Sequence, residues 1–277
     1  MQTKYIRNPT QKNDLRKSTS KYQGLIRKNM NIILFTDKNP YGFNITDQLM
    51  RANIKIKSVL IEQYPPRKRI ERFKLKIKAF IPKYFINILR KIRKLESINK
   101  WEQNKTYKTI SDLVIIVKNF NSEKTELIVK KLNPDLIILA GSRILKENII
   151  LIPRIGILNA HPGLLPKYRG VDVIQWAIYN FDPIGVTIHF IDKGVDTGLI
   201  CKQKKITIEK HDTIESLRRK AALESGILMK NVVLEILENQ TIATYPNKNE
   251  EGKQYFKMTE EELKEANLRL INININE

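Results

Sequence analysis

The chain has 277 residues, of which 42% are hydrophobic, and it carries a single cysteine and a formal net charge of +21. This length and composition allow a sizeable core in one large domain, or in one domain with appendages, and the chain need not be disordered. With Cys201 alone, the chain has neither an internal disulfide framework nor a cysteine cluster for zinc, which is consistent with a reducing compartment. No apolar stretch in the sequence approaches the roughly 20 residues that span a bilayer, so we expect a soluble, cytoplasmic protein.

The positive charge is concentrated in two segments. Residues 1–30 contain eight Lys or Arg residues and one acid without a hydrophobic period, which predicts a basic flexible tail. A basic transit peptide is the alternative for this segment, and Met30 could be the true start. Residues 67–100 contain thirteen Lys or Arg residues and two acids. Because the rest of the chain is nearly neutral, the net charge alone does not indicate a nucleic-acid-binding protein.

The elements that follow the tail alternate between strands and helices. A strand is predicted over NIILFT at 31–36. A turn and a helix are predicted over the following PYGFNITDQLMRAN, and a second strand over IKSVLIE. The pattern repeats with LVIIV at 113–117, a helix over 122–132 and DLIILA at 135–140. Continuous apolar strands between amphipathic helices predict an α/β fold, with an open, Rossmann-like and mostly parallel sheet that helices cover on both faces. Ligands of such sheets bind at the carboxyl ends of the strands.

The basic segment 67–100 interrupts this alternation. Its apolar residues recur every three or four positions from Ile70 to Leu95, and Pro82 kinks or divides the pattern, which predicts a basic amphipathic helical insert. Its apolar face would pack on the sheet while its charges face solvent. The alternative is a contact between its basic face and an anionic membrane surface or a polyphosphate.

The second half of the chain begins with strands over GVTIHFID (185–192) and LICKQKKITI (199–208), joined by a turn at 193–198. A long helix follows and runs to about Glu238. Asp212 is its expected N-cap, and Glu215 would complete a capping box. We therefore divide the chain into the tail 1–30, a main domain 31–245 that contains the insert, and a short C-terminal extension 246–277.

Three polar residues are candidates for chemistry. A strand over 155–161 would place Asn159 and His161 on one face at its carboxyl end, where Pro162 ends the strand. Asp196, in the turn before the next strand, could lie beside the imidazole. A carboxylate raises the pKa of a histidine, and a side-chain amide can donate to a developing oxyanion, so the three residues suit acyl transfer. Ordinary turn formation is the alternative, and His189 would either border this site or have a structural role.

The segment NAHPGLLPKYRG, followed by GVTIHFIDKGVDTG, resembles the signature of the folate-dependent formyltransferases. This family includes glycinamide ribonucleotide, methionyl-tRNA and nucleotide-sugar formyltransferases. The resemblance begins at about Asn31 and is strongest from Asn121 to Ile208; Gly163 replaces a serine that is common in the family. It implies the formyltransferase fold over 31–245, 10-formyltetrahydrofolate as co-substrate and no metal.

The same resemblance assigns roles to individual residues. Asn159, His161 and Asp196 would be the catalytic residues, with Asn159 and a protonated His161 stabilising a tetrahedral intermediate while Asp196 keeps His161 charged. The folate would lie against a short segment after the DLIILA strand and against the loop before Asp196. The folate-binding residues would be Ser142, Arg143, Ile144, Leu145 and Val195. Core packing is the alternative for the side chains of Ile144 and Leu145.

The acceptor of the formyl group is inferred by elimination. TDKNPYGFNITD lacks the glycine-rich phosphate loop of glycinamide ribonucleotide formyltransferases, and only about 40 residues follow the long helix, where methionyl-tRNA formyltransferases carry a further domain. We therefore expect a small primary amine, a nucleotide-linked amino sugar, with the other two acceptors as alternatives. A non-catalytic RNA- or membrane-binding protein on the same scaffold is the alternative from another class. The basic tail and insert would then contact an anionic surface, and a homodimer is also open.

Overall fold

The computed structural model describes residues 29–36, 39–62, 111–141 and 143–276. Most of the predicted tail, the whole predicted insert 67–100 and Ser142 lie outside these described residues. The described parts contain the predicted alternation of strands and helices, followed by a strand and a helix in the C-terminal extension.

Seven strands of the described residues form one sheet in the order β3-β2-β1-β4-β5-β7-β8. The first five run parallel to one another, whereas β7 is antiparallel to both β5 and β8. The prediction of an open, mostly parallel sheet is therefore confirmed. The strands are β1 (Ile32–Thr36), β2 (Ile56–Glu62), β3 (Val114–Val117), β4 (Leu136–Ala140), β5 (Gly156–His161), β7 (Ile184–Phe190) and β8 (Ile200–Ile206).

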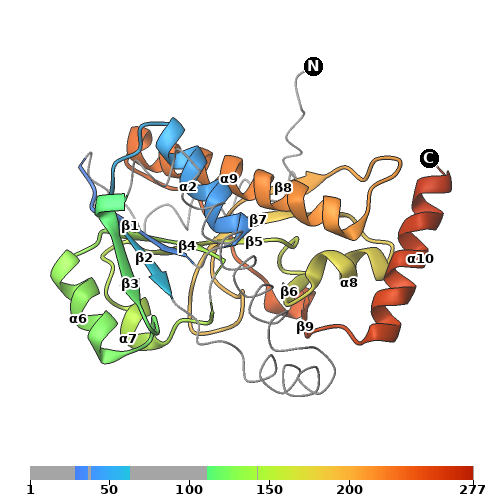
Figure 1. Ribbon diagram of the computed structural model, residues 1–277, viewed down its shortest axis with the longest axis horizontal. Helices are drawn as coiled ribbons and strands as arrows, with labels where there is room; N and C mark the ends of the chain where they lie inside the picture. Colours follow the sequence, from blue (N-terminus) through green and yellow to red (C-terminus); the bar gives the residue numbers. More distant parts are fainter. Residues whose placement is uncertain (1–28, 37–38, 63–110, 142, 277) are drawn as a thin grey trace, which may run out of the picture.

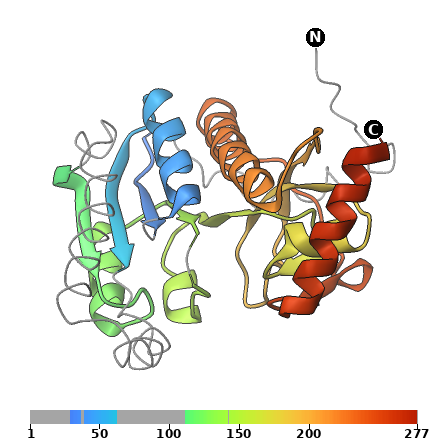
Figure 2. The ribbon, with the colours of Figure 1, turned by 45° about the vertical axis from the view of Figure 1, so that its right-hand side comes forward.

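Helices cover both faces of this sheet. Helices α2 (Pro40–Arg51) and α9 (Ile214–Asn239) lie side by side on one face, and α6 (Glu123–Leu132) and α7 (Glu147–Ile150) lie on the other, as Figures 1 and 2 show from two directions. The short helix η2 (Ser111–Leu113) leads into β3. None of the described helices is long and apolar enough to cross a membrane.

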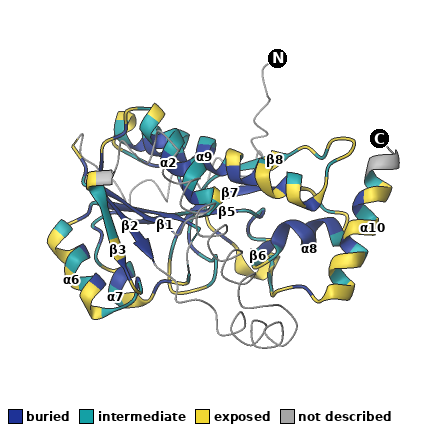
Figure 3. Cartoon of the chain, in the orientation of Figure 1, coloured by how far each residue is buried: buried dark blue, intermediate teal, exposed yellow. Residues whose placement is uncertain are grey.

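The core consists of two apolar clusters, one on each face of the sheet. In β1, Ile32 and Leu34 belong to the cluster under α2 and α9, whereas Ile33 and Phe35 belong to the cluster under α6 and α7. Successive side chains of a strand point to opposite faces, so a strand covered on both sides must be apolar at every position. Figure 3 shows β1 and β4 buried throughout, which explains the uninterrupted apolar runs of these two strands in the sequence.

The predicted start of the long helix was wrong by one residue. Thr213, and not Asp212, is the N-cap of α9, and its partner in the capping box is Ser216 in place of Glu215. The Asp212 carboxylate instead accepts a hydrogen bond of 2.8 Å from the backbone N–H of Glu209 and pairs with Lys220 Nζ at 2.6 Å. Those contacts use the carboxylate in the turn before the helix, so the next hydroxyl takes the capping position.

The C-terminal extension contains structure that the sequence pattern did not predict. Strand β9 (Lys253–Tyr255), preceded by the short helix η3 (Asn249–Glu251), pairs in parallel with β6 (Tyr168–Gly170) in a small second sheet. Helix α10 (Glu260–Asn276) packs against α8 (Val173–Tyr179). The last described residues therefore lie against the segment that directly follows β5.

Candidate active site

The three predicted catalytic residues line one cavity. This cavity of about 280 Å³ lies at the carboxyl end of β5, and its walls include Asn159, His161 and Asp196. Arg143, Ile144, Leu145 and Val195, which are the predicted folate-contact residues that the structure describes, line the same cavity. Residues predicted from three separate stretches of sequence are thus brought together.

His161 is held in one orientation by the contacts of its two ring nitrogens. The ring is almost fully buried, and its Nε2 lies 2.7 Å from the backbone carbonyl oxygen of Tyr168. A carbonyl oxygen can only accept a hydrogen bond, so Nε2 is the protonated nitrogen. Nδ1 faces Asp196 Oδ2 at 3.4 Å. Nδ1 is therefore the position at which this imidazole gains or loses a proton.

The environment of His161 favours its neutral form. Burial lowers the pKa of His161 below its ordinary value, and the neighbouring His189 adds to this, although the charge of Asp196 acts in the opposite direction. This direction differs from the charged resting imidazole that we expected from the resemblance. The cost of burying the charge exceeds the attraction of one carboxylate at this distance.

Asp196 is a partly buried carboxylate that stays ionised. Burial acts to raise its pKa, but the imidazoles of His161 and His189 and the backbone N–H of Gly170 together hold the pKa well below its usual range. The Gly170 N–H donates to Oδ2 at 2.9 Å, and Oδ1 lies 3.5 Å from His189 Nε2. The carboxylate therefore lies between two histidines and remains charged at neutral pH.

His189 borders the site and orients Asn159. It lies opposite Asn159 in the β5–β7 pairing and is fully buried. Its Nδ1 donates to the Phe190 carbonyl oxygen at 2.8 Å, so in the neutral ring Nε2 accepts from Asn159 Nδ2 at 3.1 Å. This bond uses one N–H of the Asn159 amide and leaves the second for another acceptor.

Arg143 and its neighbours form the wall where the resemblance places the folate. Arg143 Nε donates to Glu62 Oε2 at 2.8 Å, and the fully buried Glu62 side chain also accepts from the Phe120 N–H at 3.1 Å. Ile144 is 73% exposed and Leu145 only 5%, so core packing applies to Leu145 and not to Ile144. The Asn121 amide fixes this segment by bonding the Ile144 carbonyl and the Lys146 N–H.

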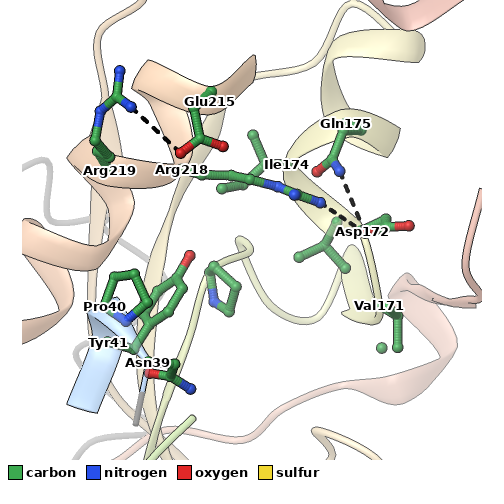
Figure 4. Close-up of a pocket in the computed structure, with 13 residues that line it drawn as sticks. Asn39, Pro40, Tyr41, Val171, Asp172, Ile174, Gln175, Glu215, Arg218 and Arg219 are labelled. Carbon is green, nitrogen blue, oxygen red and sulfur yellow. Dashed lines mark hydrogen bonds and ion pairs between the residues drawn. The ribbon is translucent and has the colours of Figure 1, made fainter. Parts of the chain in front are cut away.

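A second cavity of about 460 Å³ adjoins the first, and the two share Pro162, Gly170 and Val171 in their walls. Figure 4 shows that α9 contributes Arg218 and Arg219 while Tyr41 points toward them from the start of α2. Burial raises the pKa of Tyr41 to about 12, so its hydroxyl stays protonated. Each arginine already has a carboxylate partner: Arg218 pairs with Asp172 at 3.0 Å and Arg219 with Glu215 at 3.4 Å.

Sequence reasoning missed Glu62 and Asn121, and it assigned Tyr168 and Gly170 no catalytic contact. Glu62 gave one usable signal, because an acidic residue that follows the apolar run of β2 falls at the ligand-binding edge of a parallel sheet. Asn121 gave none, because its amide bonds backbone groups of a distant segment. Tyr168 and Gly170 gave none either, because each contributes its own backbone group to the site. Within the described parts of the chain, no group of three or more His, Cys, Asp or Glu side chains is arranged to hold a metal ion.

The fold and the cavity define an open α/β protein with a candidate acyl-transfer site at the carboxyl end of its central strands. Comparison with known families identifies it further. The family model described as "Formyl transferase" matches residues 30–233, which is most of the chain. The chain therefore belongs to the formyl transferase family.

The curated relatives that the chain matches first are methionyl-tRNA formyltransferases. A methionyl-tRNA formyltransferase of Ehrlichia ruminantium (strain Gardel) is 37% identical over 131 residues, which cover 44% of this chain and 43% of that protein. The chain thus spans less than half the length of the curated relatives it matches first.

Solved structures show the same fold at lower identity. A glycinamide ribonucleotide transformylase from Symbiobacterium toebii has a TM-score of 0.54 at 19% identity, covering 78% of this chain and 90% of its own. A sugar N-formyltransferase from a Shewanella species has a TM-score of 0.54 at 17% identity, and the match covers 87% of this chain and 88% of that chain.

Proposed function

We propose that this protein transfers a formyl group from 10-formyltetrahydrofolate to the primary amine of a small acceptor, a nucleotide-linked amino sugar. The observation that carries the proposal is the pair of adjoining cavities. One cavity holds Asn159, His161 and Asp196, and the other holds two arginines; Pro162, Gly170 and Val171 form the wall between them. Two co-substrates that react with each other need two such sites with a common boundary.

In this proposal Asn159 stabilises the negative charge that develops during the reaction. The acceptor nitrogen forms a bond to the formyl carbon, and the carbonyl oxygen becomes an oxyanion. The second N–H of the Asn159 amide, which does not bond His189, donates a hydrogen bond to that oxyanion. Such a hydrogen bond is stronger in a buried site than in water.

His161 and Asp196 act as one proton-holding pair. The pair accepts a proton from the attacking amine at Nδ1 of His161, where Asp196 Oδ2 lies 3.4 Å away. It returns that proton to the folate nitrogen as the bond between this nitrogen and the formyl carbon breaks. The products are the formamide and tetrahydrofolate, with no net change in protons on the protein.

The second cavity supports an anionic acceptor. The guanidinium groups of Arg218 and Arg219 suit bidentate recognition of phosphate oxygens. Both are at least 45% exposed in their ion pairs, and exposed pairs contribute only about 0–1 kcal/mol. An incoming diphosphate can therefore replace Asp172 and Glu215 as partner at little cost.

The test is to supply 10-formyltetrahydrofolate together with one amine at a time and to measure the release of tetrahydrofolate. The amines are dTDP- and UDP-linked amino sugars, glycinamide ribonucleotide and methionyl-tRNA. Faster release with an amino sugar, abolished in His161→Ala, is the expected result. Preference for either of the other acceptors would overturn the acceptor assignment. No acceleration by any amine, together with salt-dependent RNA or vesicle binding that survives His161→Ala, would favour the non-catalytic alternative.

A further inference from the structure

Asn247 connects the C-terminal extension to the turn that carries Asp196. The Asn247 side chain is 8% exposed, and its Nδ2 donates to the backbone carbonyl oxygens of Asp196 at 2.8 Å and of Gly198 at 3.1 Å. Asp196 has a φ of 53°, in the left-handed region that a non-glycine residue adopts only when its surroundings hold it there. The two hydrogen bonds from Asn247 are part of these surroundings, and they come from outside the turn.

Strand β9 of the same extension supports the other side of the catalytic cluster. It pairs with β6, where Tyr168 lies opposite Lys253 and Gly170 opposite Tyr255. Strand β6 supplies two backbone groups to the site: the Tyr168 carbonyl that accepts from His161 and the Gly170 N–H that donates to Asp196.

The fit between β6 and β9 is close at two glycines. Gly170 has a φ of +97°, and a Cβ at this position would lie 2.2 Å from the Tyr255 carbonyl oxygen. A Cβ at Gly252 would lie 1.7 Å from the Pro166 carbonyl oxygen. Neither position accepts a side chain without moving the backbone. The rings of Tyr168 and Tyr255 stack across the pair with centroids 5.1 Å apart.

The extension is also fixed to the second cavity. The Met258 N–H donates to Asp172 Oδ2 at 3.2 Å, and Asp172 is the partner of Arg218 there. Residues 247–258 therefore bond a lining residue of each cavity, although they lie beyond residues 30–233, which the family model matches.

We infer that Asn247 is a positioning residue for Asp196 and that residues 247–258, together with the 31–245 domain, complete the active site. The inference rests on the proposed function for its kinetic consequence and on the contacts of Asn247 for its structural one. Without the Asn247 amide, two carbonyl groups of the turn lose their donor, and the Asp196 carboxylate is less firmly held beside Nδ1 of His161.

The kinetic test compares Asn247→Ala with the parent protein. Misplacement of a catalytic group by about 1 Å can cost on the order of 100-fold in rate, so we expect kcat to fall by about 10- to 100-fold while KM for 10-formyltetrahydrofolate changes little. The isosteric Asn247→Asp variant, which keeps the shape but replaces the amide donor by an oxygen, should behave in the same way if Asn247→Ala does not fold.

The titration of His161 provides a readout that does not require activity. Among the described residues, the titratable groups that face its ring are Asp196 and His189, and of these only the carboxylate raises the pKa of His161. Nuclear magnetic resonance can resolve the three histidines of the chain. In Asn247→Ala, a less firmly held Asp196 should lower the pKa of His161 further.

Tyr245→Phe is the matched control, because it removes a hydrogen bond of 2.9 Å from the Tyr245 hydroxyl to Gln203 in the same stretch of chain without touching the turn at Asp196. It should lower the melting temperature and leave both kcat and the His161 titration unchanged. The inference is overturned if Asn247→Ala changes only the melting temperature, or if Tyr245→Phe shifts the titration equally. If the parent protein transfers no formyl group, the proposed function fails, while the titration still decides the role of Asn247.

Discussion

The Asp196 carboxylate lies 3.4 Å from Nδ1 of His161, on the side of the ring opposite the nitrogen that donates to the Tyr168 carbonyl. With Nε2 committed to a backbone oxygen, each change in the charge of His161 takes place at the nitrogen next to Asp196. The carboxylate therefore favours a proton on this imidazole and opposes the larger effect of burial.

Replacing Asp196 by Asn should shift the pH dependence of formyl transfer. The Asp196 charge raises the pKa of His161 while burial lowers it, so without that charge the pKa falls further. Because His161 must be neutral to accept the proton of the attacking amine, its lower pKa should move the acidic limb of the kcat profile toward lower pH. We expect the maximum rate to fall as well, since the imidazole becomes a weaker base. A profile with an unchanged acidic limb would contradict the role of Asp196.

Replacing Asn159 by Ala should lower kcat on the order of 100-fold, because the oxyanion loses one donor. KM for 10-formyltetrahydrofolate should change little, since the bond forms only as the charge develops. Asn148→Ala is a suitable control, since this asparagine bonds Glu126 on the face covered by α6 and α7. Equal losses in the two variants would show a general effect on the fold.

Replacing Arg218 by Ala should raise KM for the nucleotide-linked acceptor without changing KM for 10-formyltetrahydrofolate. Loss of a charge-assisted bond costs about 1.5–3 kcal/mol, which corresponds to an increase on the order of 10- to 100-fold. Lys220→Ala removes a cation from the same helix outside the cavity, where Lys220 pairs with Asp212. It should leave both KM values at the wild-type level. A change in KM for the folate alone would indicate that the cavity with Arg218 binds the folate and that the cavity with His161 binds the acceptor.

Replacing Glu62 by Gln should weaken folate binding through Arg143. The buried carboxylate accepts from Arg143 Nε at 2.8 Å, and a neutral amide would hold the guanidinium less firmly. We expect a higher KM for 10-formyltetrahydrofolate. If Glu62 acts through Arg143, the double variant with Arg143→Ala should bind the folate no worse than Arg143→Ala alone. Additive losses would mean that Glu62 has a separate role.

The stability of the protein should fall as the pH drops below about 6.5, the ordinary pKa of histidine. The pKa of His161 is lowered in the folded state, so the unfolded chain binds a proton more readily below that pH, which favours unfolding. The His161→Asn variant should lose less stability between neutral pH and about pH 5 than the parent does, as measured by urea unfolding. The corresponding change at the exposed His211 should leave the parent's pH dependence intact.

Much of the fold and the center of the site could be predicted because the signals are local. The apolar runs of β1 and β4 reflect burial on both faces of each strand, and the alternation of side chains in β5, ended by Pro162, placed Asn159 and His161 together. The resemblance supplied Asp196 and the folate wall.

The remaining contacts depend on segments that meet only in the folded chain. Strand β9 has three residues and pairs with a strand more than 80 positions earlier, so it carries no periodic pattern. Asn247 lies in an irregular stretch where an asparagine usually indicates a turn. The choice of Thr213 over Asp212 as helix cap depended on Lys220, which competes for the carboxylate.

The parallel pairing of β6 with β9 has a consequence for how the protein matures during synthesis. The seven-stranded sheet and α9 comprise residues that leave the ribosome before residue 247, so they can fold while the extension is still being made. The turn at Asp196 gains its support from Asn247, and the backbone at Tyr168 gains its pairing with β9, only after those residues have been made. If the proposed function holds, a nascent chain would therefore acquire its fold before its catalytic competence.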